Sequence, residues 1–231
     1  MRIGVLLCDD LHEGLETHWT SYRAMFEAML SPAGRVRAWR CHADEWPPDP
    51  TECDAWVVSG SRASVYEDKS WIVRLLAFVA DAHAAGRSLL GICFGHQVVN
   101  AALGGDVARA ESGWGLGLHR AAVVEDFGRW RRGEEIALLS VHQDQVARPA
   151  PGMRRLATSR FCPNYVTAAP GVLTVQGHPE FDRAFFSALL PRLVEKAGQI
   201  RVDRARESLA RPDDHDAFRG YACAFLAGEA A

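Results

Sequence analysis

One stretch near the middle of the chain decides the fold: Ser88-Leu-Leu-Gly-Ile-Cys-Phe-Gly-His-Gln-Val-Val-Asn-Ala-Ala-Leu-Gly-Gly105. It begins with a short apolar run that suits a buried parallel strand, and from Val98 its apolar residues follow helical spacing. The pattern therefore predicts a strand, a sharp turn at Cys93 and a helix. A cysteine at such a turn lies beside the positive end of the helix, which stabilises the thiolate over the thiol. Cys93 is the leading candidate for a nucleophile.

The composition is that of an ordinary globular chain. Its 231 residues include 48% hydrophobic and 24% charged residues, with a net charge of -3. This balance argues against a nucleic-acid binder, and no apolar run reaches the roughly 18 residues that a membrane span needs. The six cysteines lie far apart without a C-x-x-C pair, which argues against a zinc site or a secreted disulfide framework. We expect a cytoplasmic protein that contacts neither nucleic acid nor a membrane.

Strands alternate with helices on the N-terminal side of this stretch. Three apolar runs predict buried strands at Ile3–Leu7, Val36–Trp39 and Ala55–Ser59. Helical spacing predicts a helix over Tyr22–Leu30, with Thr20 or Ser21 as its N-cap, and another that Ser70 caps and Gly86 ends. Such alternation requires crossover connections and a parallel sheet. The predicted fold class is therefore α/β, an open and mostly parallel twisted sheet with helices on both faces.

The sequence after Gly105 has a different pattern. Glu111–Gly117 is rich in glycine and predicts a loop, but it lacks the spacing of a phosphate-binding loop. Further strands, some of them antiparallel, are predicted at His119–Val124, Ile136–Val141, Met153–Ser159 and Val172–Val175. Helical repeats after Glu180 predict two or three surface-packed helices, the first bent by Pro191. We see no linker, and we expect a single domain over residues 1–231, with residues 191–231 as a C-terminal helical extension packed on it.

A second motif, Gln176-Gly-His-Pro-Glu180, supplies what a thiolate nucleophile needs. Such a nucleophile requires a base, and the base requires an orienting group. His178 follows the end of a predicted strand, and Pro179 prevents the backbone from continuing a ladder. Glu180 can hydrogen-bond the imidazole and hold its tautomer. From the residues alone, Cys93, His178 and Glu180 are candidates for such a constellation, and with nine histidines and six cysteines in the chain other pairings stay open.

The segments GICFGHQ (residues 91–97) and QGHPE (residues 176–180) together resemble the class I (triad) glutamine amidotransferases. The resemblance extends from the first strand to about Leu190, and it implies a flavodoxin-like sheet with the nucleophile at a strand-helix elbow. In that family the elbow cysteine attacks the side-chain amide of glutamine. The resemblance therefore implies that Cys93 is the nucleophile, that His178 is the base and then the general acid, and that Glu180 orients it.

Attack on a γ-amide produces a tetrahedral oxyanion, which two backbone N–H groups should stabilise. One of them is the N–H of Phe94, the residue after the nucleophile. The resemblance implies that the other comes from Gly60-Ser61, where the family usually has Gly-Gly-Pro and this chain has Gly-Ser-Arg.

The same resemblance suggests three substrate contacts. Gln97 lies in a Gly-His-Gln that is similar to the glutamine-binding turn of the family. The segment Val141-His-Gln-Asp-Gln-Val146 resembles the family's His-x-Asp-x-Val stretch. Asp144 could meet the substrate ammonium and His142 could line the pocket. A purely structural turn is the alternative interpretation for both residues.

The expected activity is hydrolysis of the γ-glutamyl amide bond of glutamine or of a γ-glutamyl compound, through a cysteine thioester and without a metal or organic cofactor. The chain lacks the S-G-G-x-D-S loop of the GMP synthetases whose amidotransferase half it resembles. Two alternatives stay open. One is an ammonia-supplying glutaminase subunit of a separate synthetase, and the other is a regulatory binding module without catalysis.

Two departures from the family pattern resemble the stand-alone GMP-synthase-like amidotransferases, a group that includes γ-glutamyl peptidases. One is Gly177, at a position where synthetase-feeding domains commonly have Phe, and the other is the Ser59-Gly-Ser61 turn. A small residue at position 177 predicts room beside the base for a leaving group larger than ammonia.

Overall fold

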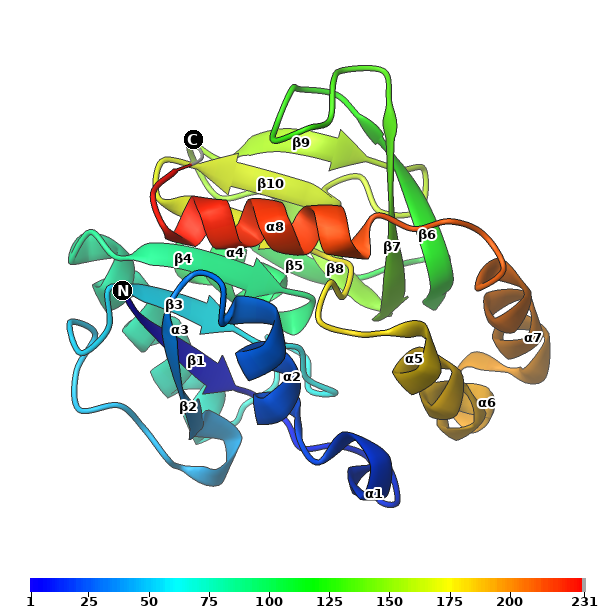
Figure 1. The fold of residues 1–231 in the computed structure, drawn as a ribbon, viewed down its shortest axis with the longest axis horizontal. Helices are drawn as coiled ribbons and strands as arrows, with labels where there is room; N and C mark the ends of the chain where they lie inside the picture. The colour runs from blue at the N-terminus through cyan, green and yellow to red at the C-terminus, as the bar shows by residue number, and fades with distance from the viewer. Residues whose placement is uncertain (230–231) are drawn as a thin grey trace.

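The computed structural model describes residues 1–229, and its centre is a nine-stranded sheet (Figure 1). The first half of the chain supplies parallel strands in the spatial order β2, β1, β3, β4. Their bounds are β1 Arg2–Leu7, β2 Arg35–Arg40, β3 Ala55–Val58 and β4 Ser88–Ile92. Helices cover both faces of the sheet and bury the apolar runs of β1, β3 and β4. The four strands predicted in this half are confirmed.

The second half of the chain extends the same sheet. β11 pairs in parallel with β4, and the order continues through β10, β9, β6 and β7 in antiparallel fashion. Their bounds are β6 Gly115–Val123, β7 Glu135–His142, β9 Arg154–Thr158, β10 Val166–Ala169 and β11 Val172–Val175. The open α/β sheet and the predicted antiparallel part are both confirmed. Two strands far apart in the sequence, β4 and β11, thus lie side by side at the centre.

The sequence analysis missed three strands, β10, β5 (Asp106–Arg109) and β8 (Asp144–Arg148). β5 and β8 pair in a separate two-stranded sheet, and both are largely polar, so they lack the apolar pattern of a buried strand. The predicted loop Glu111–Gly117 is wrong at its end, because β6 already begins at Gly115. The overlap is three residues, and errors of this kind at element boundaries are expected when tertiary pairing decides them.

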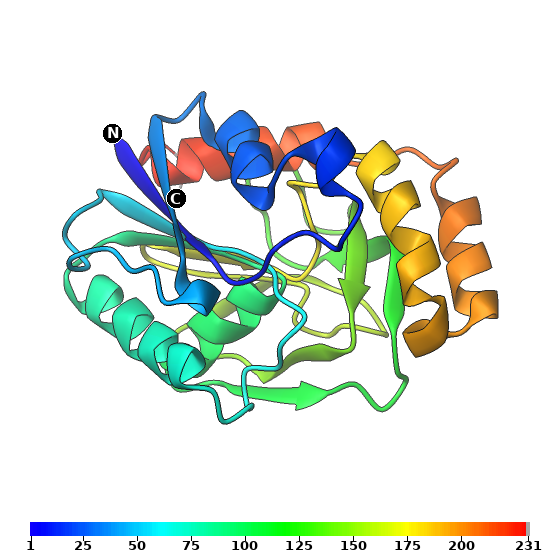
Figure 2. The same ribbon diagram turned by 90° about the horizontal axis from the view of Figure 1, so that it is seen from below.

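Two layers of helices cover the central sheet, as the view from below shows (Figure 2). On one face, α2 (Tyr22–Leu30) and α8 (His215–Leu226) bury residues such as Phe26 and Phe218 against β1, β4 and β11. On the other face lie α3 (Ser70–Ala84) and α4 (Phe94–Ala102). α2 and α3 each bury one apolar face, which explains their helical spacing, whereas α4 is buried on all sides over Phe94–Asn100.

The helix caps agree only in part with the prediction. The Ser21 hydroxyl accepts the N–H of Ala24 and caps α2, as predicted. Ser70 is already the first residue of α3, whose N-cap is Lys69 without a side-chain bond, so the predicted Ser70 cap is wrong. Gly86 has a φ of +71° and ends that helix, as predicted.

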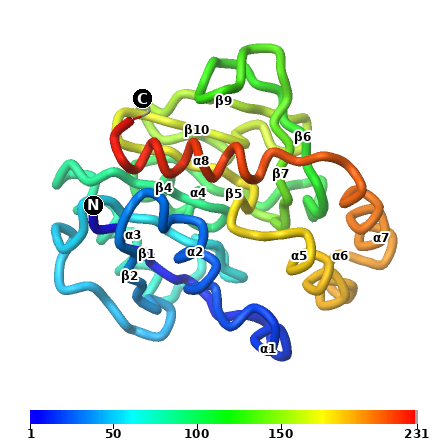
Figure 3. Tube along the Cα trace, viewed as in Figure 1, coloured from blue at the N-terminus to red at the C-terminus, as the bar shows by residue number. Residues whose placement is uncertain are grey.

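A group of helices after the second motif packs beside β6 and β7, away from the parallel strands (Figure 3). It comprises α5 Arg183–Leu189, the 3-10 turn η2 Leu190–Leu193, α6 Val194–Ala197 and α7 Gln199–Ser208. Pro191 lies in η2, where the α-helical bonding of α5 has ended. Within residues 1–229, no helix has the length and apolar content needed to cross a membrane.

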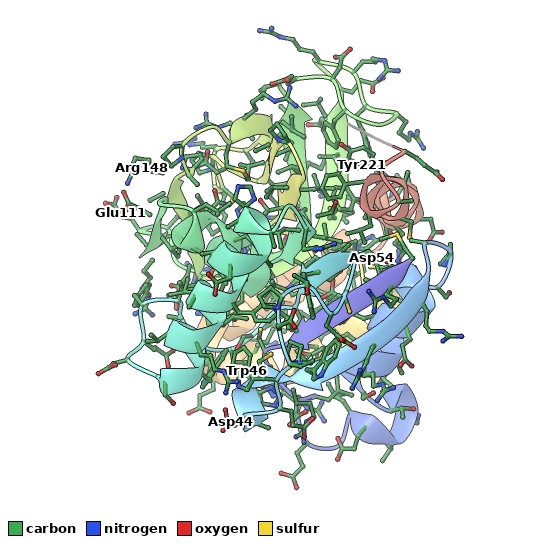
Figure 4. All side chains as sticks on the ribbon, turned by 90° about the vertical axis from the view of Figure 1, so that its left-hand side faces the viewer. Asp44, Trp46, Asp54, Glu111, Arg148 and Tyr221 are labelled. Carbon is green, nitrogen blue, oxygen red and sulfur yellow. The ribbon has the colours of Figure 1, made fainter. Side chains whose placement is uncertain are left out.

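The remaining elements are short. α1 (Glu16–Trp19) precedes α2, and the 3-10 turn η1 (Cys41–Ala43) follows β2. The chain then returns from α7 through α8, so that Tyr221 of α8 and Arg148 of β8 lie on opposite sides of the molecule (Figure 4). The small β5–β8 sheet and α8 therefore approach the central strands from different sides.

Candidate active site

Cys93 stands between the end of β4 and the first residue of α4. Its φ of 54° and ψ of -106° form a backbone conformation that residues with a side chain rarely adopt. The Cys93 N–H donates to the carbonyl of Val175 at 2.8 Å, which holds the turn to β11. A Cβ atom on Gly95 would overlap the carbonyl oxygen of Val58, so glycine allows α4 to start directly against β3. The predicted elbow is confirmed.

The pairing of β4 with β11 brings the second motif to this elbow. Val175 is the register partner of Ile92, so the residues that follow each strand emerge at the same edge of the sheet. The His178 N–H then donates to the carbonyl of Leu139 in β7 at 2.7 Å. Strands from both halves of the sheet thus fix where His178 lies.

His178 and Glu180 form a buried pair. Nδ1 of His178 lies 2.7 Å from Oε1 of Glu180, and the two residues are 4% and 6% exposed. The imidazole stacks on Phe181, with ring centroids 4.2 Å apart and planes 4° apart. Among residues 1–229, Nε2 of His178 has no hydrogen-bond partner. The pair has the arrangement of an oriented base whose second nitrogen is available for proton transfer.

Gln176 is a contact that the sequence analysis did not assign, although it lies in the second motif. Its Nε2 donates to Sγ of Cys93 at 3.7 Å, and its Oε1 accepts from Nε2 of Gln97 at 3.2 Å. Gln176 is fully buried, so its amide dipole faces the sulfur without competing water. The side chain supports negative charge on the sulfur.

The electrostatics of His178 favour its protonated form. Burial disfavours a charged ring, but the negative charges of Cys93 and Glu180 outweigh it and raise the pKa of His178 to about 10. Since the ordinary value is 6.5, the ring stays protonated at neutral pH and loses its proton only as the pH rises toward 10. The site therefore favours an imidazolium beside Cys93 and Glu180.

This pairing can be tested by titrating the ring in isotope-labelled protein by NMR. Cys93→Ala removes the larger of the two raising charges, so the midpoint of His178 should fall by about one pH unit or more. Cys41→Ala, which removes a buried thiol outside the site, should leave the midpoint where it is in the unaltered protein. An identical midpoint in all three proteins would show that the thiolate does not act on the ring.

The candidate oxyanion donors lie beside the triad residues. The N–H of Phe94 is the first of α4, and the first N–H groups of a helix have no intrahelical acceptor. A Cβ atom on Gly60 would lie 3.0 Å from Cε1 of His178 and 3.7 Å from Cβ of Cys93, so this turn borders both groups closely. Within residues 1–229, neither Gly60 nor Ser61 donates its N–H to a protein acceptor. These donors are therefore available to a ligand.

The three predicted substrate contacts differ in how the structure uses them. Gln97 is 3% exposed, and its Nε2 also donates to the carbonyl of Asp144 at 2.8 Å. His142 is 4% exposed, and its Nδ1 lies 3.0 Å from the same carbonyl. The carboxylate of Asp144 accepts from the hydroxyls of Ser64 and Tyr66 and faces the cavity. Of the three, Asp144 offers the most accessible polar group.

Gly177 does not line the cavity. A Cβ atom at this position would lie 2.6 Å from Oη of Tyr165 and 2.8 Å from Cβ of Leu138. That hydroxyl is itself bonded to Oγ of Ser140 at 2.9 Å in the core. The prediction that a small residue here widens the leaving-group side is therefore wrong. Glycine at position 177 makes room for a buried tyrosine.

α8 also contributes to the site, which no local sequence pattern indicated. Nε of Arg219 donates to the carbonyl of Pro179 at 2.6 Å, and its Nη2 donates to that of Phe181 at 3.1 Å. The N–H of Leu139, whose carbonyl binds the N–H of the base, donates to Nε2 of His215 at 3.2 Å. The start of α8 thus holds the turn that carries the base.

The residues predicted for the site border one cavity of about 460 Å³ at the C-terminal edge of the parallel strands. Cys93, His178 and Glu180 line it together with Gly60, Ser61 and Phe94, and so do Gln97, His142 and Asp144. In open α/β sheets this edge is the usual place for ligands. Within the described residues, no three His, Cys, Asp or Glu side chains gather in a way that could hold a metal ion.

Comparison with known proteins gives consistent results. The family described as glutamine amidotransferase class-I matches residues 22–190. Gamma-glutamyl peptidase 4 of Arabidopsis thaliana is 29% identical over 210 residues, which cover 87% of this chain and 83% of that protein. Gamma-glutamyl peptidase 5 of the same plant is 30% identical over 183 residues, covering 73% and 72%.

Solved structures share the fold. A glutamine amidotransferase from Thermotoga maritima has a TM-score of 0.76 at 18% identity and covers 99% of this chain and 97% of its own. A putative GMP synthase subunit from Thermoplasma acidophilum has a TM-score of 0.59 at 17% identity, covering 95% and 96%. The match of the family to most of the chain, together with this fold, identifies it: the chain belongs to the class I glutamine amidotransferases.

Proposed function

We propose that this protein hydrolyses the γ-glutamyl amide bond of glutamine or of a γ-glutamyl compound through a thioester on Cys93. One observation carries the proposal. Cys93 and the His178–Glu180 pair border the same cavity, and the second imidazole nitrogen has no protein partner within the described residues. The γ-glutamyl peptidases among the relatives support a hydrolase of this kind.

The reaction follows from the positions of these groups. The thiolate of Cys93 attacks the γ-carbonyl carbon, and the C=O electron pair moves onto oxygen, where the N–H groups of Phe94 and of Gly60 or Ser61 stabilise it. The oxyanion then collapses, the C–N bond breaks, and His178 gives its proton to the departing nitrogen. A γ-glutamyl thioester and a free amine or ammonia result.

Water completes the cycle. His178, now neutral, takes a proton from a water molecule that attacks the thioester carbonyl. The C–S bond breaks, glutamate leaves, and the thiolate-imidazolium pair is restored. Glu180 keeps the ring in one orientation throughout, because its carboxylate accepts the Nδ1 proton at 2.7 Å. In this scheme Asp144 binds the substrate ammonium, and no cofactor is required.

The principal alternative is a glutaminase subunit that delivers ammonia to a separate synthetase. The structural similarity to a putative GMP synthase subunit favours keeping it as a second candidate. In that case the triad would act only after a partner docks. We also propose a reducing compartment such as the cytoplasm, a choice supported by six cysteines that are all free.

A substrate panel without any partner tests the proposal. Purified protein should release glutamate from at least one of glutamine, a γ-glutamyl dipeptide and a γ-glutamyl anilide. Diazo-oxo-norleucine, a glutamine-like electrophile, should label Cys93, as peptide mass spectrometry would reveal. Labelling without turnover would favour the partner-dependent glutaminase, and neither labelling nor turnover would leave only a binding module.

A further inference from the structure

The cavity continues beyond the triad residues. Besides Cys93, His178 and Phe181, its lining includes Arg192 and Lys196, which lie on the η2 and α6 segments that follow the second motif. His178 is the group that protonates the leaving nitrogen in the proposed reaction. In that reaction the part of the substrate that follows this nitrogen would extend along the cavity lining, which includes residues of η2 and α6.

The carboxylates that line the cavity already have partners. Asp9 forms an ion pair with Arg62, and Glu180 is bonded to His178. Asp144, as described above, accepts from two hydroxyl groups. Asp9 and Glu180 are therefore compensated by positively charged partners, whereas Asp144 accepts only from neutral hydroxyl groups and keeps its charge for the substrate ammonium.

The cations Arg192 and Lys196 differ from the two compensated carboxylates, because within the described residues no charged partner binds them directly. Nη1 and Nη2 of Arg192 donate to the carbonyls of Ala188 at 3.0 Å and Glu13 at 2.9 Å, which fixes the guanidinium without neutralising it. Among residues 1–229, neither Arg192 nor Lys196 forms an ion pair with a carboxylate. Both side chains are exposed and border the cavity. Both cations thus line the same cavity without an ion-pair partner among the described residues, and the carboxylate of Glu16 acts on Arg192 only at longer range.

His12 lines the same cavity as these two cations. The ring of His12 is half-buried, and burial, followed by the positive charges of Arg62, Arg192 and Lys196, lowers its pKa. Leu189 and Leu193 line the same cavity and supply apolar surface to it. The part of the cavity lining that η2 and α6 supply therefore combines positive charge with apolar surface.

We propose that Arg192 and Lys196 form a subsite for a carboxylate on the leaving group, so that the preferred substrates are γ-glutamyl amides of amino acids or peptides. The proposal rests on the hydrolase function proposed above. Guanidinium and ammonium groups bind carboxylates through charge-assisted hydrogen bonds, and this subsite would distinguish such substrates from glutamine, whose leaving group is ammonia.

A pair of substrates that differ only in the charge of the leaving group tests the subsite. For unaltered protein, kcat/KM should be about tenfold or more higher with γ-glutamylglycine than with γ-glutamylglycinamide. Added salt should reduce this ratio, because the cations are exposed to solvent. Arg192→Gln and Lys196→Gln should each lower the ratio, and Lys196→Glu should bring it below one.

Arg204→Gln is the matched control, because it removes an exposed positive charge on α7 that does not line the cavity. Its ratio should equal that of the unaltered protein. Lys196 makes no hydrogen bond within residues 1–229, so its variants should fold even if Arg192→Gln does not. Equal rates on both substrates would overturn the subsite and leave the hydrolase function standing. No turnover and no thioester on Cys93 would overturn both.

Discussion

Cys93→Ala should reduce γ-glutamyl hydrolysis at least about 10⁴-fold, because loss of a nucleophile removes the whole thioester route. The fold should persist. Alanine at this position keeps the same backbone conformation, with a φ of 54°, and the change removes only one sulfur atom from a 5% exposed site. Glutamate release measures the activity, and thermal unfolding measures the stability.

Cys41→Ala provides the comparison for this variant. It removes a fully buried thiol outside the cavity, so it should cost stability without abolishing turnover. If Cys93→Ala retained activity within tenfold of the unaltered protein, Cys93 would not be the nucleophile.

His178→Ala should lower kcat by about 10⁴-fold, whereas Glu180→Gln should retain roughly ten to a hundred times more activity than His178→Ala. The first change removes the proton acceptor. The second keeps an oxygen that can accept the Nδ1 proton of His178, which lies 2.7 Å from Oε1, but it removes the negative charge that supports the imidazolium. Turnover of one γ-glutamyl substrate by both variants measures the difference.

His83→Ala offers a control for loss of an imidazole, because His83 is exposed near the end of α3 and does not border the cavity. It should retain full activity. Equal losses in His178→Ala and Glu180→Gln would contradict the separate roles of base and orienting group. They would favour a single ionic unit that fails when either member is removed.

The parts of the site that follow from sequence are those encoded locally. A strand, a turn and a helix follow one another within Ser88–Gly105, so the elbow at Cys93 could be predicted from apolar spacing alone. The same holds for the turn of His178 and Glu180, where two residues of separation allow the observed bond. The local sequence patterns did not establish that the turn at Cys93 and the turn at His178 meet at one edge of the sheet. The pairing of β4 with β11 accounts for that.

The errors arise where distant segments decide the outcome. The space around a Cβ atom at Gly177 is taken by Tyr165 and Leu138, which are distant in sequence, so the position of Gly177 next to His178 did not reveal it. Arg219 is separated by 40 positions from Pro179, whose carbonyl it binds. Such contacts depend on how α8 packs across the sheet, and no local pattern encodes that packing.

The adjacency of β4 and β11 also has a consequence for biosynthesis. Gln176 is 83 residues from Cys93, so at about 5 to 20 residues per second a ribosome adds the base several seconds after the nucleophile. The last interaction around the base comes later still, from Arg219 of α8. A nascent chain that has formed its elbow therefore carries a thiol without a proton acceptor. The proposed hydrolysis requires the pairing of β4 with β11, so a nascent chain should gain it only after that pairing forms.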